Sequence, residues 1–383
     1  MNESKKDTTP IDDIDTSTRR TIFGGVGFNR FNGTDFDDAE VFPAMQGAFE
    51  QAMKQFPEAV YESNFLFSGQ PVRIRVVGGD FAQHIVQPFA HLQNDKMGRR
   101  TPQLTIDLWD ENATNIRCFT GSRGICRGWE DVTSMSPDGQ YIGQMQPNTL
   151  TCFDRNTQHI VGCIAWSDQI PIYERAKPLS RLLLEWNNDR QIQVIHAGLV
   201  SQHGQGVLFV AKSGSGKSTT SLACLCTGFD YVGEDFIGLE KLRDGSFIGH
   251  SLYNSVFLET GHLAWFPQLS PYVIRGAPHE EKAVVILSHV FPERLARVAT
   301  VRAVVLLRVA GESESRLQSI SKSQALLALA PCSLIEIPSR GIDGFSRLAQ
   351  LVEQVPTYAL ELGCDLESIP RRVGEIIAEV NRS

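Results

Sequence analysis

The sequence of 383 residues has no run of about 18 apolar residues, the length that a membrane-spanning helix requires, so we expect no membrane partner. Residues 1–22 lack the apolar segment of a secretory signal, and their polar composition is typical of a disordered tail. Basic residues are outnumbered 36 to 44, which gives a net charge of −8. This acidic balance argues against a nucleic-acid partner. Without a secretory signal, we expect a cytoplasmic protein.

Cysteine is scarce and scattered, without the regular spacing of a small disulfide scaffold. The eight cysteines are at positions 118, 126, 152, 163, 224, 226, 332 and 364. This pattern favours reduced thiols over disulfides. Cys224 and Cys226 are two steps apart on an expected helix and therefore face different directions, which makes them a poor metal-binding pair.

The first part of the chain predicts a mixed α+β, strand-rich domain over residues 23–170. Helical spacing of apolar residues covers residues 42–56, and alternation around a Gly-Gln turn predicts a strand pair over residues 63–79. Strand-like pieces then alternate with turn signals from residue 118 to residue 164. This part contains no motif with a clear chemistry.

The rest of the chain predicts an α/β domain over residues 171–383. A helical segment from Tyr173 leads into the apolar strand runs "IQVIHAGLVS" and "GVLFVAK", and the strand "DYVGEDFIGLEKL" ends at a predicted type I′ turn, Asp244-Gly245. Two buried strands, "AVVILS" and "VRAVVLLRVA", follow. Ser321 and Gln324 predict a capping box, and the chain ends as helix, strand and helix.

Residues 211–218 match the phosphate-binding loop G-x-x-x-x-G-K-[ST], with Ala211 in place of the first glycine. The strand "GVLFV" precedes the loop and the helical "STTSLACLC" follows it, as the motif demands. Alanine can begin the turn where φ is negative. The predicted nucleotide-binding residues are Ser213, Gly214, Ser215, Gly216, Lys217, Ser218 and Thr219. The alternative is a glycine- and serine-rich linker that contains Gly-Lys-Ser by chance.

Two adjacent acids, Glu234 and Asp235, end the strand that follows the loop helix. One carboxylate is positioned to hold Mg²⁺ through water, and the other to take a proton from an attacking hydroxyl. Neighbouring negative charges raise the pKa of one member of such a pair, which suits that member to act as a base. The alternative is a solvated acidic pair.

The residues from His196 through the loop to the paired acids resemble the C-terminal catalytic domain of HPr kinase/phosphorylase, and still more the shorter bacterial serine kinases related to it. The resemblance implies a P-loop fold shared with phosphoenolpyruvate carboxykinase and transfer of the γ-phosphoryl group of ATP, with Mg²⁺, to a serine-type hydroxyl. In that family a histidine begins the strand before the loop, at the spacing that separates His196 from Lys217. The convincing match covers roughly residues 191–240.

The same resemblance implies a role for each site residue. Lys217 would hold the β- and γ-phosphates, Ser218 and Asp235 would hold the metal, and His196 would lie near the general base. Glu234 occupies the base position, where the family has aspartate, and its side chain is longer by one C–C bond, ~1.5 Å. The acceptor is a peptide, a protein or a small molecule, selected by the N-terminal domain.

Other roles remain open. Arg294, Arg275 and Lys282 are alternatives for contacting the transferred phosphate, and Asn254 stands where the family's HPr-contacting stretch is expected. Four tryptophans are expected in the core: Trp109, Trp129, Trp166 and Trp186. Arg175, Lys177 and Arg181 either line the site or form a solvated helix face. The rival functions are a P-loop NTPase without an acceptor and an inactive nucleotide-binding module. A homo-oligomer and a reverse phosphorylase reaction are undecided.

Overall fold

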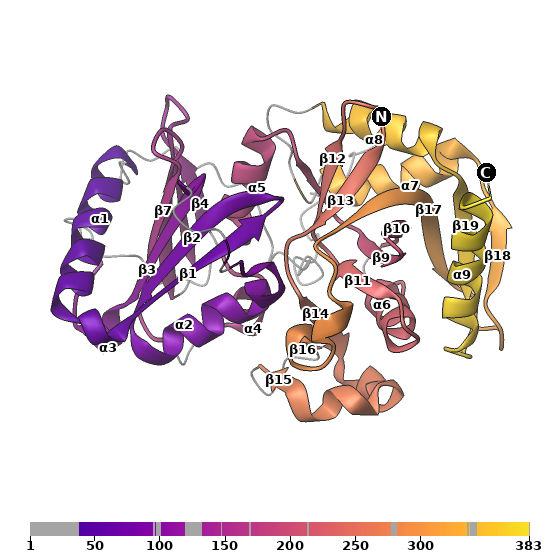
Figure 1. The fold of residues 1–383 in the computed structure, drawn as a ribbon, viewed down its shortest axis with the longest axis horizontal. Helices are drawn as coiled ribbons and strands as arrows, with labels where there is room; N and C mark the ends of the chain where they lie inside the picture. The colour runs from indigo at the N-terminus through magenta and orange to yellow at the C-terminus, as the bar shows by residue number, and fades with distance from the viewer. Residues whose placement is uncertain are drawn as a thin grey trace, which may run out of the picture.

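A computed structural model of the protein describes residues 38–94, 96, 101–118, 132–146, 148–167, 170–212, 214–276, 282–334, 337 and 343–382. The predicted tail over residues 1–22 lies outside these ranges, as do Cys126, Trp129 and Ser213. The fold is α/β, as expected, with two large sheets lying side by side (Figure 1). No helix within the described ranges is long and apolar enough to cross a membrane.

The first sheet belongs to the N-terminal half. In spatial order its strands are β1 (Val60–Phe67), β2 (Gln70–Val77), β3 (Leu104–Asp110), β7 (His159–Ile164), β6 (Thr149–Asp154), β5 (Tyr141–Gln146) and β4 (Val132–Met135). The β1–β2 hairpin confirms the predicted strand pair, and its turn residues Ser68 and Gly69 both have positive φ. The pairs β2–β3 and β3–β7 are parallel, and the other neighbours are antiparallel.

Helices cover both faces of this sheet. On one face α1 (Asp38–Gln55), which begins before the predicted residue 42, buries Phe42, Met45 and Phe49. On the other face lie α2 (Gly79–Val86) and η3 (Gln87–Leu92).

The second sheet carries the loop motif. Its strands are β11 (Asp230–Gly233), β9 (Gly198–Gln202), β10 (Gln205–Val210), β17 (Val298–Val309), β13 (Phe247–Ser251), β12 (Ile237–Lys241) and β8 (Gln193–Ile195), with β19 (Thr357–Leu362) paired to β17 and β18 (Arg316–Ser319). The strands β10 and β19 both run parallel to β17. A small sheet of β14 (Ser255–Glu259), β16 (Lys282–Ile286) and β15 (Val273–Arg275) lies beside it.

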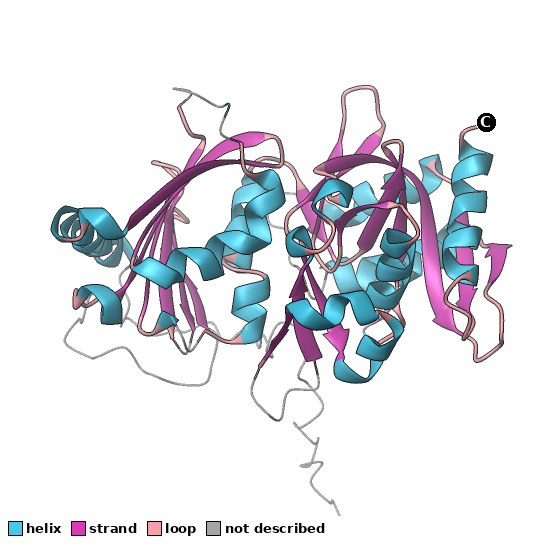
Figure 2. Ribbon diagram, turned by 60° about the horizontal axis from the view of Figure 1, so that its bottom comes forward, coloured by secondary structure: helices cyan, strands magenta, loops and turns pink. Residues whose placement is uncertain are grey.

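Alternating side chains of β10 point to opposite faces of the second sheet. Leu208 packs against α7 (Lys322–Leu334) and α8 (Gly344–Gln354), whereas Phe209 packs toward α6 (Lys217–Cys226) and α9 (Ser368–Val380). Figure 2 shows these helices around the strands. This two-sided burial is typical of parallel strands and explains the continuous apolar run in the sequence.

Two predicted turn and cap details have different outcomes. The capping box is confirmed, since the Gln324 N–H donates to Ser321 Oγ at 3.2 Å and the Ser321 N–H donates to Gln324 Oε1 at 3.1 Å. The prediction of a type I′ turn is wrong, because such a turn requires positive φ at both central residues, and Gly245 has positive φ whereas Asp244 does not. The loop is longer than two residues: the Leu242 N–H donates to the Ser246 carbonyl, and the Asp244 side chain accepts from the Ser246 N–H.

A shared core joins the two halves of the chain. Trp186 of α5 (Ser180–Asp189), Phe236 and Tyr253 pack in one apolar cluster with residues of the first sheet. The Asn254 amide donates to the Pro88 carbonyl at 3.0 Å across the same boundary. Asn254 is therefore a structural contact. Trp109 and Trp186 are buried as predicted, whereas Trp166 is partly exposed.

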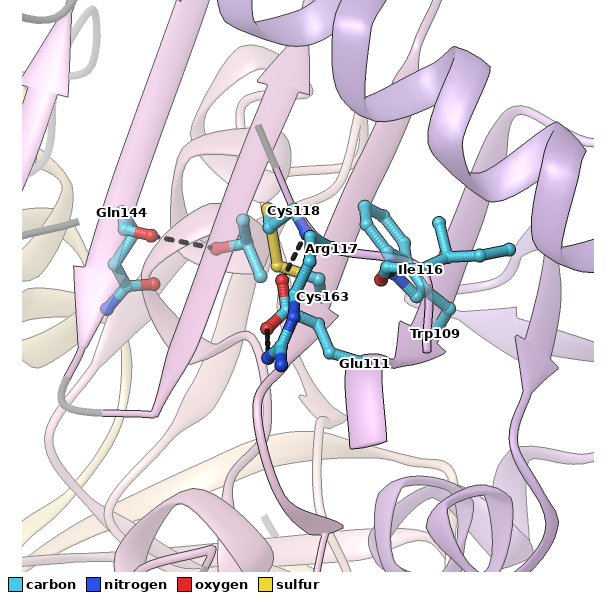
Figure 3. Close-up of a disulfide and its surroundings, with 8 residues drawn as sticks. Trp109, Glu111, Ile116, Arg117, Cys118, Gln144 and Cys163 are labelled. Atoms are coloured by element: carbon cyan, nitrogen blue, oxygen red, sulfur yellow. Dashed lines mark hydrogen bonds and ion pairs between the residues drawn. A yellow bond between two sulfur atoms is a disulfide. The ribbon is translucent and has the colours of Figure 1, made fainter. Parts of the chain in front are cut away.

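Cys118 and Cys163 form a disulfide, so the expectation of reduced thiols is wrong for this pair (Figure 3). Cys163 lies on β7, and Cys118 follows α3 (Glu111–Thr114), which continues from β3. The chain that leaves β3 passes beside the neighbouring strand β7, a contact that cysteine spacing does not reveal. Glu111 fixes this segment, since its carboxylate accepts from the Cys118 N–H and pairs with Arg117 at 3.8 Å. The other described cysteines form no disulfide: Cys152, Cys224, Cys226, Cys332 and Cys364.

The boundary between the halves contains a partly buried neutral histidine, His91. The Asn254 amide donates to His91 Nδ1 at 3.3 Å, so the ring proton lies on Nε2, which donates to Ser251 Oγ at 2.7 Å. Burial and the nearby Arg297 lower the pKa of His91 to about 3. Between that pH and about 6.5 the unfolded chain therefore binds a proton that the folded protein excludes.

We accordingly expect the free energy of unfolding to fall as the pH is lowered from 7.5 to 5, with a slope from His91 of at most about 1.4 kcal/mol per pH unit. Urea unfolding at both pH values measures this loss, which His91→Gln should reduce. Exposed His203→Gln is the matched control. Equal pH dependence in the wild type and His91→Gln would contradict the assignment.

Candidate active site

The loop motif lies between β10 and α6, as predicted. Gly214 and Gly216 have φ values of +76° and +90°, a backbone conformation that favours glycine. A side chain at Gly216 would also meet the Leu362 methyl group at 2.6 Å. Ala211 has negative φ, so alanine is accommodated without strain at the position where the motif has glycine.

Lys217 begins α6 and folds back over the loop. Its Nζ donates to the Ala211 carbonyl at 3.1 Å, and the residue is buried. Ser218 and Thr219 follow in the first helical turn and are partly exposed. The ammonium and the first N–H groups of the helix together provide a site for an anion.

His196 and the two acids lie at breaks between strands, whereas the sequence predicted an uninterrupted strand through His196 and a strand end at the acids. The chain leaves β8, which pairs with β12, and at His196 and Ala197 changes to β9, which pairs with β10. Glu234 and Asp235 occupy a second break between β11 and β12, where Asp235 has a φ of +61°. These residues lie outside the hydrogen-bonded strand pairs, so their side chains do not follow the alternation of a strand. The side chains of His196 and Asp235 instead lie close together.

Glu234 is buried beside the loop helix. Its Oε1 accepts from the Phe257 N–H at 2.9 Å, whereas Oε2 has no hydrogen-bond partner in the described part of the chain. Burial and the negative charge of Asp235 raise the pKa of Glu234 to about 7, against the opposing effects of Lys177, Ser218 and the Phe257 N–H. The Ser218 hydroxyl exerts this effect from outside normal hydrogen-bond geometry.

Asp235 has the opposite electrostatic character. Burial alone would raise its pKa, but Lys177, His196 and Lys217 together hold the pKa of this carboxyl well below its usual range. Lys177 Nζ donates to Oδ2 at 2.5 Å, and His196 Nε2 lies 3.2 Å from Oδ1. The His196 N–H in turn donates to Ser333 Oγ at 3.2 Å, which fixes the histidine against α7.

In the sequence, Lys177 is not distinguishable in role from two neighbouring arginines, Arg175 and Arg181. Lys177 follows α4 (Ile172–Ala176), is buried, and lies over the rings of Phe236 and Phe257 at 5.2 and 4.8 Å. Arg175 instead contacts His84 Nδ1 at 3.0 Å, and Arg181 pairs with Glu185. The sequence signal for a site role of Lys177 was its place between two apolar helical segments. Its partner, Asp235, is 58 positions away in the chain.

The three basic residues considered for the phosphate lie on the small sheet and its connections. Arg275 is exposed at the end of β15, and Lys282 begins β16. Arg294 donates to the Gly228 carbonyl at 3.1 Å and pairs with Asp230 at 3.6 Å. Lys177 and Lys217 are therefore the cations that the structure places at the paired acids.

Comparisons with known proteins agree with the resemblance. No protein-family model matches the chain. The chain is 29% identical over 91 residues to the HPr kinase/phosphorylase of Lachnoclostridium phytofermentans, a match that covers 22% of this chain and 29% of that protein. A solved structure of the Hpr(Ser) kinase/phosphatase from Coxiella burnetii aligns with 50% of this chain and 97% of its own, at 13% identity and a TM-score of 0.27, too low to support an argument. The similarity to the HPr kinase/phosphorylase family is thus confirmed as a partial one.

Proposed function

We propose that the chain is a kinase that uses ATP and Mg²⁺ to phosphorylate a hydroxyl group of the serine type. The observation that carries this proposal is the arrangement of the two buried acids. Asp235 is held between Lys177 and His196, while Glu234 keeps one carboxylate oxygen free of hydrogen bonds within the described chain. An inactive nucleotide-binding module does not require this division into a fixed carboxylate and an available one.

The residues present fit a magnesium nucleotide. The left-handed glycines and the start of α6 form a phosphate cradle, and Lys217 lies over it. The Ser218 hydroxyl and the Asp235 carboxylate are the oxygen ligands that Mg²⁺ prefers, and each carboxylate oxygen keeps a second lone pair beside its present partner. When bound, Mg²⁺ neutralises charge on the phosphates.

The side chains then have separate tasks. Lys217 binds and orients the β- and γ-phosphates, and His196 and Lys177 hold Asp235 ionised and in place. Glu234 takes the proton of the acceptor hydroxyl at Oε2, while the Phe257 N–H fixes Oε1. Glutamate is one methylene longer than the aspartate of the family, and the hydrogen bond from the Phe257 N–H fixes the position of its carboxylate. Positioning and charge neutralisation supply most of the catalysis in such reactions.

γ-Labelled ATP with Mg²⁺, offered to a cell extract separated into small molecules and macromolecules, tests the proposal. We expect label in an acceptor, whereas label only in free phosphate would identify an NTPase. Lys217→Met should lower ATP affinity about 10- to 100-fold by calorimetry, because charge-assisted hydrogen bonds to phosphate are lost. Exposed Lys241→Met is the control. Equal ATP binding by Lys217→Met would contradict the assignment of the loop.

A further inference from the structure

A cavity of about 60 Å³ lies between the first sheet and the turn that carries Lys177. Leu108 of β3, Thr151 of β6 and Ile164 of β7 line one side. The other side belongs to the segment that connects the halves and to the second half of the chain, and includes Phe236 and Phe257. Ligand sites often lie where two structural units meet.

This cavity shares a wall with the candidate active site. Phe236 directly follows Asp235, and the Phe257 N–H donates to Glu234 at 2.9 Å. Lys177 lines the cavity and donates to Asp235 at 2.5 Å. Glu234 and Asp235 do not line the cavity themselves, but the residues that contact or follow them form its wall at this end.

The volume limits the size of the ligand. One water molecule requires roughly 10–15 Å³ of such space, so the cavity accepts about four to six non-hydrogen atoms. A nucleotide is much too large for it, as is the surface loop of a folded protein. A small free molecule fits.

The lining limits the chemistry of the ligand. Phe81, Ile85 and the aliphatic residues of the first sheet make most of the wall apolar. Glu174 of α4 is a buried acid on this wall, and its Oε2 accepts from the Thr149 hydroxyl at 2.9 Å. A carboxylate accepts about four hydrogen bonds, so an ammonium group can bind Glu174 beside Thr149.

On the basis of the proposed function, we propose that this cavity is the acceptor site and takes a small amino alcohol. The ligand ammonium binds Glu174, and its hydroxyl lies at the end lined by Lys177, Phe236 and Phe257. In the transfer step the hydroxyl oxygen bonds to the γ-phosphorus, and the bond from that phosphorus to the β–γ bridging oxygen breaks. The hydroxyl proton passes to Glu234, and the products are the phosphate ester and ADP.

Initial rates with γ-labelled ATP test the site, with 2-aminoethanol and 3-amino-1-propanol as acceptors, and 1-propanol and propylamine as compounds that lack one group. We expect the two amino alcohols to be labelled and the other two compounds not. Glu174→Gln should raise KM for the amino alcohol about 10- to 100-fold with little change in kcat, because a charge-assisted hydrogen bond is lost. Exposed Glu50→Gln should leave both constants unchanged.

The outcomes separate this inference from the proposed function. Label in macromolecules alone would overturn the cavity assignment and leave the kinase proposal standing, as would equal KM values for Glu174→Gln and the wild type. Label in no acceptor at all would refute both. Thr149→Val, which removes the hydroxyl bound to Glu174, provides a second variant if Glu174→Gln does not fold, and should also raise KM.

Discussion

Glu234→Gln is expected to lower kcat for phosphoryl transfer by about 10² to 10⁴-fold, the usual contribution of a general base. Glutamine keeps the length of the side chain and can still accept from the Phe257 N–H, but its amide cannot take the acceptor proton. ATP affinity should change little, because Lys217 and the loop, not Glu234, are the proposed phosphate ligands. Single-turnover rates and calorimetry measure the two quantities separately.

The control for this variant is Asp244→Asn, which removes a carboxylate from an exposed loop beyond β12. This change should leave kcat within about twofold of the wild-type value. Substitutions on the surface rarely change the free energy of unfolding by more than about ±0.5 kcal/mol. If Glu234→Gln transfers phosphate at the wild-type rate, Glu234 is not the base. If it no longer binds ATP, the glutamate supports the loop instead.

Lys177→Met is expected to destabilise the protein by about 3–5 kcal/mol, because it leaves Asp235 buried without its closest positive charge. Methionine retains much of the apolar stem between Phe236 and Phe257, so the loss reports mainly on charge. Urea unfolding without nucleotide gives the free energy directly.

A double-mutant cycle supplies the control. Asp235→Asn removes the negative partner, so the pair Lys177→Met/Asp235→Asn should recover part of the stability lost by Lys177→Met alone. Additive losses in the double variant would show that the two side chains do not interact energetically.

Features that a local sequence pattern determines were predicted correctly. The phosphate-binding loop was predicted with its flanking strand and helix, because left-handed glycines, a lysine and a helix start occur within a few residues. The capping box of Ser321 and Gln324 is equally local, and its predicted hydrogen bonds are present. The roles of the loop residues in binding ATP remain predictions.

Features that depend on distant parts of the chain were not predictable. The breaks at His196 and Asp235 arise because adjacent strand segments pair with different partners, which an apolar run cannot indicate. The role of Lys177 depends on Asp235, a carboxylate 58 positions later in the chain, and the Cys118–Cys163 disulfide depends on the pairing of β3 with β7. The dipeptide Asp244-Gly245 correctly indicated the hairpin between β12 and β13 but not the type of its turn, because the pairing of the two strands sets the length of the loop.

Gly216 packs against Leu362, a residue of the last strand, β19. During translation the loop over residues 211–218 leaves the ribosome long before that strand does. A nascent chain therefore lacks one wall of the loop until synthesis has continued past Leu362.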